Sequence, residues 1–224
     1  LQNSNRTNFY RKFILKKPIW SSTLDTLSPG QKKKDFDKDG VLQRMEIQLS
    51  KSGIKTKFTK NIDLTWTHSD IKRLLKKYTN GEYILLFPFC SKRHLNKRWP
   101  YYKELVSKLK QNYKNEFSIL TAPGPGEIDE AHKLNTKVVL VNNEPVNIIT
   151  LINLIKNAKF IISNDTGPAH ICSHLNKKGL VLFGSHTSPN KVSIGNTNFK
   201  TIQVSNLKDL TCGNVLEEIK KNLN

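Results

Sequence analysis

The pattern of apolar and polar positions changes at Glu82. From that residue onward, short continuous apolar runs alternate with stretches in which apolar residues recur every three or four positions, as on one face of a helix. The first run, residues 83–87 (Tyr-Ile-Leu-Leu-Phe), is apolar throughout, which is typical of a strand buried on both faces of a sheet. The pattern predicts a parallel sheet whose strands are joined by helices.

The same pattern gives the order of the elements. Strands are expected at residues 83–87, 117–121, 137–141, 160–162 and 180–183, and helices at residues 100–113, 127–134, 147–157, 167–175 and 214–223. Repeated strand–helix–strand units of this length indicate an α/β fold with a doubly wound parallel sheet.

Residues 1–80 lack this alternation. Ser28-Pro29-Gly30, followed by lysines, predicts an exposed loop. A helix is expected from Val41 to Ser52, because Gly53 is a good carboxy-terminal stop. A second helix should begin at Ser69 or Asp70 and run through Tyr78.

Charge adds a second feature. Lysine and arginine number 37 against 18 acidic residues, for a net charge of +19 and a pI near 9.8. Residues 1–80 carry 18 basic and 7 acidic side chains, so the excess is densest there. Such a field attracts nucleic acid, an anionic membrane face or a phosphorylated glycolipid. A general abundance of lysine is the competing explanation for the charge.

Composition also excludes several classes of protein. No apolar run approaches the roughly 20 residues that a membrane-spanning helix needs. Cys90, Cys172 and Cys212 are scattered, with no CxxC pair, so neither a disulfide framework nor a zinc site is indicated. We therefore expect a reducing compartment.

Three polar clusters follow predicted strands, and ligands of open parallel sheets bind beyond the carboxyl ends of the strands. The first, residues 90–100, places four cations and a hydroxyl just before a helix, which favours an anion site. A solvated basic loop is the alternative. The second, residues 121–127, sets glycines beside Glu127, whose carboxylate can accept hydrogen bonds from a ribose diol. Turns of this kind are also ordinary between a strand and a helix.

The third cluster, residues 163–170, gathers Asp165, Thr166 and His170 at the start of a helix. Asp165 or Thr166 is expected to cap this helix, and Pro168 suits its first turn. The backbone donors and the Thr166 hydroxyl would then face a diphosphate. A capped core helix is the alternative. All three clusters are expected to converge on one crevice.

These motifs resemble a known family. Residues 165–170 (Asp-Thr-Gly-Pro-Ala-His), with residues 182–189 (Leu-Phe-Gly-Ser-His-Thr-Ser-Pro) after the next strand, are similar to the D-T/S-G-x-x-H … LFG-x-T-x-P signature of glycosyltransferase family 9. These enzymes are the ADP-heptose:lipopolysaccharide heptosyltransferases. Residues 97–100 resemble the family's K-R/H-W-P element, and residues 124–127 resemble its glycine–glutamate turn. Three motifs in the family's order make a specific signal.

The resemblance implies a GT-B architecture, in which the first Rossmann-like domain binds the acceptor and the second binds the donor. It divides this chain into residues 1–80 (part of the acceptor domain), 81–210 (donor domain) and 211–224 (carboxy-terminal helix). Lys97 would neutralise the donor diphosphate, aided by Ser91, and Glu127 would bind the ribose. The sugar and phosphates would be held by the residues of the third cluster, which are Asp165, Thr166, Gly167, Pro168 and His170.

Residues 1–7 resemble a family segment midway through the first domain, which suggests that Arg6 contacts an anionic acceptor. The family's general base lies earlier, so we expect it before Leu1, and we expect this chain to bind donor better than it turns over. The resemblance also implies a nucleotide-sugar and a glycolipid acceptor as partners, without metal, cofactor or nucleic acid. We expect a monomer, in the cytoplasm at the inner face of the cytoplasmic membrane.

Other interpretations stay open. Residues 35–46 fit the calcium-loop pattern D-x-D-x-D-G-x5-E, but Pro29, Gly30 and the lysines before it do not supply the entering helix. A non-catalytic polyanion-binding module is a second possibility. The sequence disfavours it, because it contains no zinc finger or recognition-helix motif. Another GT-B enzyme, such as a sugar epimerase, is a third.

Overall fold

The computed structural model describes residues 5–15, 27–32, 38–57, 59, 62–114 and 116–223. The chain divides into two compact units. The first comprises residues 1–62 with 190–193, and the second comprises residues 63–189 with 194–224. The domain limits expected from the family resemblance stay a prediction.

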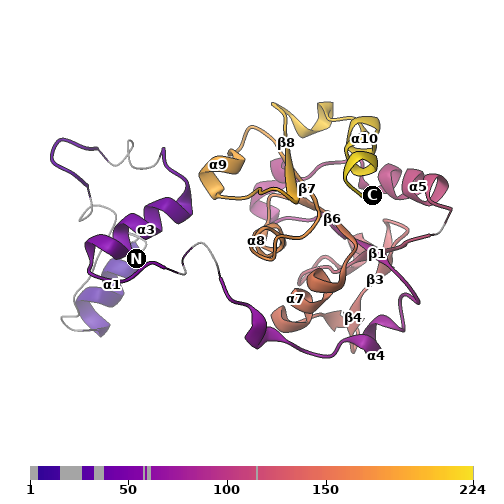
Figure 1. Cartoon of the computed structure of the whole chain (residues 1–224), viewed down its shortest axis with the longest axis horizontal. Coiled ribbons are helices and arrows are strands. Elements are labelled where there is room, and N and C mark those ends of the chain that lie inside the picture. Colours follow the sequence, from indigo (N-terminus) through magenta and orange to yellow (C-terminus); the bar gives the residue numbers. More distant parts are fainter. Residues whose placement is uncertain are drawn as a thin grey trace. The chain divides into compact units, whose positions relative to one another are not determined.

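The second unit is built on a six-stranded parallel sheet (Figure 1). The strand order is β3-β2-β1-β6-β7-β8. The strands are β1 (Tyr83–Phe87), β2 (Ser118–Thr121), β3 (Lys137–Val138), β6 (Phe160–Asn164), β7 (Gly179–Phe183) and β8 (Phe199–Gln203). All five neighbouring pairs are parallel. The chain extends the sheet from β1 in one direction, then returns and extends it from β6 in the other, which confirms the doubly wound α/β prediction.

Helices cover both faces of this sheet (Figure 1). On one face, α5 (Tyr102–Asn112) and α10 (Cys212–Leu223) pack with the buried side chains of β1, β6 and β7 in the main core. On the other lie α7 (Ile148–Asn157) and α8 (Gly167–His174). Every residue of β1 is buried, as its continuous apolar run predicts.

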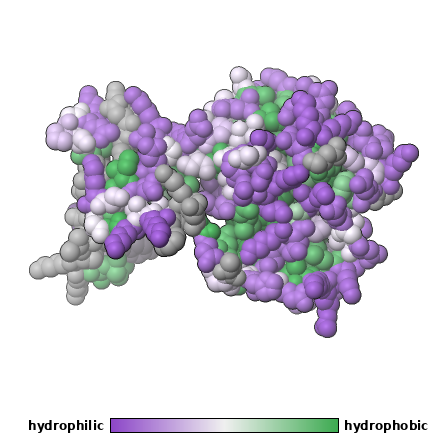
Figure 2. All heavy atoms as spheres, viewed as in Figure 1, coloured by the Kyte–Doolittle hydropathy of each residue, from purple (hydrophilic) through white to green (hydrophobic). Residues whose placement is uncertain are grey.

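The visible outer surface is mostly hydrophilic, with scattered hydrophobic areas (Figure 2).

Shorter elements complete the second unit. They are the helices α4 (Lys72–Leu75) and α6 (Ile128–His132), and the 3-10 helices η3 (Thr65–Thr67), η4 (Lys92–Lys97) and η5 (Leu207–Asp209). The short helix α9 (Pro189–Val192) falls almost wholly within residues 190–193 of the first unit. The helix expected from Ser69 or Asp70 through Tyr78 is shorter in the structure. It is α4, which ends at Leu75 and is followed by turns.

The strand expected at residues 137–141 is two strands. It breaks at Val139, and β4 (Leu140–Val141) pairs antiparallel with β5 (Glu144–Pro145). The turn between them, Asn142 and Asn143, has positive φ at both positions (52° and 63°). Asparagine tolerates this conformation, which is the one that tight hairpins need. The chain therefore forms a small hairpin beside the main sheet.

The strand β8 was not expected. Three of its five residues are exposed and Ile202 is only partly buried, so it shows no continuous apolar run. It is an edge strand that pairs on one side with β7.

The first unit holds α1 (Asn5–Phe9), the π-helix η1 (Tyr10–Ile14) and α3 (Val41–Lys51). The helix expected from Val41 is confirmed, and it stops at Gly53, which has a positive φ of 74°. Arg6 lies on α1 and is exposed.

Of the calcium-loop match, Asp35 and Asp37 lie outside the described residues. Its last position, Glu46, accepts a hydrogen bond from the Thr59 hydroxyl at 3.0 Å.

Candidate functional site

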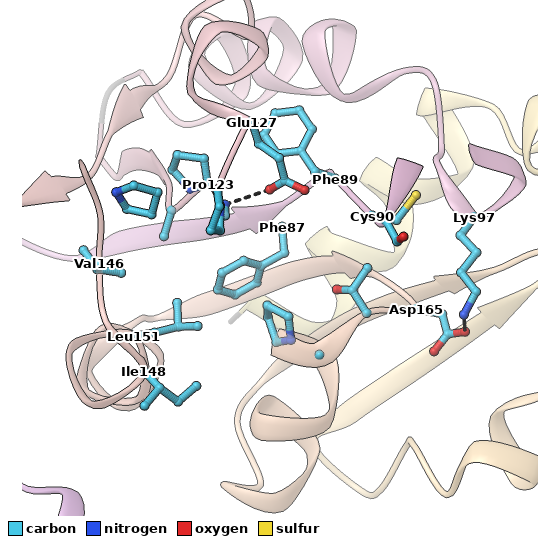
Figure 3. Close-up of a pocket in the computed structure, with 18 of the residues that line it drawn as sticks. Phe87, Phe89, Cys90, Lys97, Pro123, Glu127, Val146, Ile148, Leu151 and Asp165 are labelled. Carbon is cyan, nitrogen blue, oxygen red and sulfur yellow. Dashed lines mark hydrogen bonds and ion pairs between the residues drawn. The ribbon is translucent and has the colours of Figure 1, made fainter. Parts of the chain in front are cut away.

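A pocket of about 700 Å³ lies where the loops after β1, β2 and β6 come together (Figure 3). These strands are neighbours, and the winding of the sheet reverses between β1 and β6. Such a reversal opens a crevice at the carboxyl edge of an α/β sheet. Its lining residues are Phe87, Phe89, Cys90, Ser91, His94, Lys97, Ala122, Pro123, Gly124, Pro125, Glu127, Glu144, Pro145, Val146, Ile148, Leu151, Asp165, Thr166, Gly167 and Pro168. The three polar clusters therefore converge, as the strand order requires.

The two ends of the pocket differ in character (Figure 3). Val146, Ile148 and Leu151 form an apolar end, with Phe87 and Pro123 beside them. Lys97 and Asp165 lie at the opposite end. Ligand sites commonly combine apolar walls with a few polar groups that fix orientation. This pocket suits a ligand with an apolar part and a charged part.

Lys97 and Asp165 form an ion pair at the polar end. The Lys97 Nζ atom lies 2.7 Å from Asp165 Oδ2. The Asp165 side chain is 3% exposed and that of Lys97 is 25% exposed. A buried carboxylate needs such a partner, because leaving water without one is costly. The ammonium keeps access to the pocket and is the group there best suited to an anion.

Arg98 and Trp99, which follow Lys97, do not line the pocket. Arg98 pairs with Glu130 (Nη1 to Oε2, 2.6 Å), and its guanidinium lies over the Phe89 ring, 5.3 Å from the centroid. Trp99 is buried in the core, where its indole N–H donates to the Leu210 carbonyl at 2.7 Å. Of the cations in the first cluster, Lys97 lines the pocket, and Arg98 packs on Phe89, which also lines it.

Asn164, the last residue of β6, fixes the loops on either side of the crevice. Its amide Nδ2 donates to the Pro88 carbonyl at 2.7 Å, and its Oδ1 accepts from Trp99 N and Tyr102 Oη, both at 3.3 Å. The side chain is fully buried. Asn164 therefore holds the segment that carries Lys97 against the segment that carries Asp165.

Glu127 closes the second cluster and faces the pocket. Its Oε2 accepts a hydrogen bond from the Gly124 N–H at 2.7 Å. A Cβ at Gly124 would lie 3.2 Å from this oxygen, so the glycine permits a close approach. Burial raises the pKa of Glu127, and the bond from Gly124 opposes that rise. The Glu127 carboxylate therefore stabilises the turn at residues 124–127 and also lines the pocket.

The amino terminus of α8 also faces the pocket, through Thr166, Gly167 and Pro168. Pro168 occupies the first turn, as expected. The expected side-chain cap is wrong: Thr166 is the N-cap residue but makes no side-chain cap hydrogen bond. Asp165 instead pairs with Lys97.

The remaining expected residues lie as follows. Ser91 lines the pocket and caps η4, with its Oγ accepting from Arg93 N at 3.4 Å. His170 lies one turn into α8 and does not line the pocket. Burial lowers the pKa of His170, which favours a neutral ring at pH 7.

Two parts of the site were missed from the sequence. The β4–β5 hairpin supplies Glu144 and Pro145, and Val146 follows it. Tyr78 anchors this hairpin, because its hydroxyl donates to the Leu140 carbonyl and accepts from the Leu140 N–H, both at 3.0 Å. The second is His186, whose Nε2 lies 3.0 Å from Asp165 Oδ2. The Asn142-Asn143 pair signalled the hairpin; nothing in the spacing signalled the contact of His186.

Among the described residues, no group of three or more His, Cys, Asp or Glu side chains is placed to hold a metal ion. Within the same residues, no helix is both long and apolar enough to cross a membrane. Cys90, Cys172 and Cys212 are buried free thiols.

Solved structures share this fold at low sequence identity. E. coli heptosyltransferase WaaC with ADP aligns with a TM-score of 0.61 and 21% identity, over 80% of this chain and 56% of that one. A family 9 glycosyltransferase from Veillonella parvula gives 0.62 and 13%, over 80% and 58%. UDP-GlcNAc 2-epimerase from Methanocaldococcus jannaschii gives 0.55 and 17%, over 81% and 54%. The chain thus spans little more than half the length of these proteins.

No curated protein matches the chain. A family model does, however, and it covers most of the sequence: residues 22–221 match glycosyltransferase family 9 (heptosyltransferase). The match includes all the loops that form the pocket. The chain belongs to glycosyltransferase family 9.

Proposed function

We propose that the pocket binds a nucleotide-sugar donor, an ADP-sugar, and that the protein transfers its heptose or a related sugar to the inner core of lipopolysaccharide. The observation that carries the proposal is the Lys97–Asp165 pair beside the amino terminus of α8, at one end of a pocket whose other end is apolar.

The diphosphate belongs at the polar end. A helix amino terminus offers backbone N–H groups and a partial positive charge, so it attracts phosphate. Lys97 adds a full positive charge beside Thr166 and Gly167. The hydroxyls of Ser91 and Thr166 are further donors there, and Asp165 would contact the sugar, whereas His170 lies outside the pocket. Because a lysine and a helix terminus can neutralise the diphosphate, the proposal does not require a metal.

The nucleoside belongs at the apolar end. Val146, Ile148 and Leu151 can pack against a base, and Glu127 lies between the two ends, where a ribose would place its diol. The similar structure of E. coli WaaC is a complex with ADP, which supports an adenine nucleotide as the donor's base. A second solved structure of that enzyme contains ADP-2-deoxy-2-fluoro heptose, with a TM-score of 0.57 and 20% identity.

The reaction would be an inverting transfer. A hydroxyl of the acceptor attacks the anomeric carbon as the bond to the nucleoside diphosphate breaks, and a general base removes the hydroxyl proton. Lys97 and the amino terminus of α8 would stabilise the negative charge that develops on the leaving diphosphate. We expect the base to come from the acceptor side, with Arg6 contacting an anionic group of the glycolipid at the inner face of the cytoplasmic membrane.

Calorimetric titration with ADP, UDP and GDP at physiological salt tests the donor site. The variant Lys97→Ala should lose most of the affinity for ADP. Lys92→Ala is the matched control, because Lys92 is an exposed lysine of the same 3-10 helix that does not line the pocket.

Saturable binding that prefers ADP and depends on Lys97 supports the proposal. A folded wild-type chain that binds none of the three nucleotides contradicts it. Binding that ignores the base and disappears between low and physiological salt would favour the polyanion-binding module.

A further inference from the structure

We propose that His186 is a positioning residue of the donor site, which holds the Asp165 carboxylate in place through a proton on Nε2. The inference rests on the proposed function, because it concerns how the same site keeps its charged pair aligned. His186 lies in the loop after β7, which supplies no lining residue of the pocket.

Asp165 Oδ2 is shared by two donors. Lys97 Nζ lies 2.7 Å from this oxygen, and His186 Nε2 lies 3.0 Å from it. The two donors differ in freedom, since Lys97 is 25% exposed whereas His186 is only 7% exposed. His186 is therefore the fixed partner and Lys97 the movable one.

The packing around the imidazole fixes its orientation. Its ring stacks on the Phe183 ring, with centroids 6.2 Å apart and planes 17° apart. On its other side, His186 lines a second pocket of about 450 Å³ together with Gly184 and Ser185. The contact with Phe183 and the bond to Asp165 are therefore what orient the ring.

The same packing determines the tautomer. A carboxylate oxygen accepts hydrogen bonds, so the proton is expected on Nε2. Nδ1 is buried and makes no hydrogen bond. A tautomer with its proton on Nδ1 would leave that N–H without an acceptor and would leave Nε2 without a proton to donate to Asp165.

This arrangement matters when the donor binds. If Lys97 turns toward the diphosphate, Asp165 loses its closest partner while its side chain stays buried. The N–H of His186 remains, and it keeps the carboxylate from moving into the space that Lys97 leaves. Without His186, Asp165 would hold Lys97 more tightly and release it to a ligand less readily. The effect of His186 should therefore appear in donor affinity.

The test compares His186→Leu with His186→Gln by ADP calorimetry. A glutamine can place an amide N–H near the position of Nε2, whereas leucine fills space without a donor. We expect His186→Leu to weaken ADP binding by about tenfold, the order of one hydrogen bond to a charged group. His186→Gln should recover to within about threefold of wild type on the same scale. In an Asp165→Asn background, His186→Leu should have little further effect.

A purely structural role predicts a different result: glutamine would fail to rescue, and the loss would persist in the Asp165→Asn background. Equal ADP affinity in wild type and a folded His186→Leu also overturns the proposal. The nitrogen chemical shifts of His186 in the wild-type protein test the tautomer even if a variant does not fold, and a proton on Nδ1 contradicts it. If the wild-type protein binds no ADP, the proposed donor site is contradicted. The tautomer measurement then still shows whether His186 donates its Nε2–H to Asp165.

Discussion

The Lys97 ammonium and the Asp165 carboxylate lie 2.7 Å apart, although 68 residues of sequence separate them. One follows β1 and the other follows β6, the two strands between which the winding of the sheet reverses. The carboxylate is the more deeply buried partner. It therefore depends on the lysine for its stability more than the lysine depends on it.

This asymmetry predicts the outcome of a double-mutant cycle. Lys97→Met should lower the free energy of unfolding by about 2 kcal/mol, because it leaves a buried carboxylate without its cation. Asp165→Asn should cost less, since the more exposed ammonium can turn to water. The double variant should be more stable than the sum of the two losses predicts. Urea denaturation followed by circular dichroism measures all four proteins, and strictly additive losses would contradict the coupling.

Glu127 should give nucleotide binding at the proposed donor site a pH dependence. Burial raises the pKa of Glu127, so this carboxyl takes up a proton at a higher pH than an ordinary glutamate does. As the pH falls through that pKa, the site loses an ionised acceptor and affinity for ADP should fall. Calorimetry between pH 7 and 5 measures this. Glu127→Gln has no such group, so the difference between the two proteins isolates Glu127 from protonation of the nucleotide itself.

The same residue has the opposite effect on folding. A carboxyl whose pKa is raised in the folded state binds protons more tightly there than when unfolded, so its protonation favours the folded state. Glu127 should therefore make wild type gain stability relative to Glu127→Gln as the pH falls toward the raised pKa. Urea denaturation at several pH values checks this sign, and a relative loss on acidification would show that the raised pKa is wrong.

Tyr78 should support donor binding from outside the pocket. Tyr78→Phe removes both hydrogen bonds to Leu140 and frees the hairpin that brings Glu144 and Pro145 to the pocket. We expect ADP affinity to fall by about three- to tenfold and stability by about 1–2 kcal/mol. Tyr101→Phe is the matched control: it removes one hydroxyl bond, to the Lys208 carbonyl, away from the pocket. Equal effects of the two variants on affinity would contradict the anchoring role.

Trp99 should matter for stability. Trp99→Phe leaves the Leu210 carbonyl without its donor and creates a cavity in the core, so it should cost about 2–3 kcal/mol. Trp66→Phe is the control, because Trp66 is 72% exposed and should change stability by less than about 0.5 kcal/mol. Thermal denaturation of the two variants compares them directly, and a similar shift in both would contradict this account of the core.

The sequence was most informative where one local rule determined the structure. The apolar run at residues 83–87 predicted a buried central strand, and the strand order then brought the three polar clusters to one edge. Pairings that depend on tertiary packing were missed. The strand β8 has an exposed, polar face, and His186 meets Asp165 only because β6 and β7 are neighbours. Neither Asp165 nor Thr166 caps α8 with its side chain, because the Asp165 carboxylate contacts Lys97 and His186 and the Thr166 hydroxyl donates to the Asn164 carbonyl.

The bond from Asn164 to the Pro88 carbonyl spans 76 residues. The β1–β6 pairing next to it spans a similar separation, and contacts between distant residues form late, because a long loop must close first. A nascent chain that ends before β6 therefore has β1 and β2 but no donor pocket. Nucleotide binding should appear in refolding only after the amides of β1 gain protection from hydrogen exchange on the β6 side. A bound nucleotide would thus report that β1, β2 and β6 have come together.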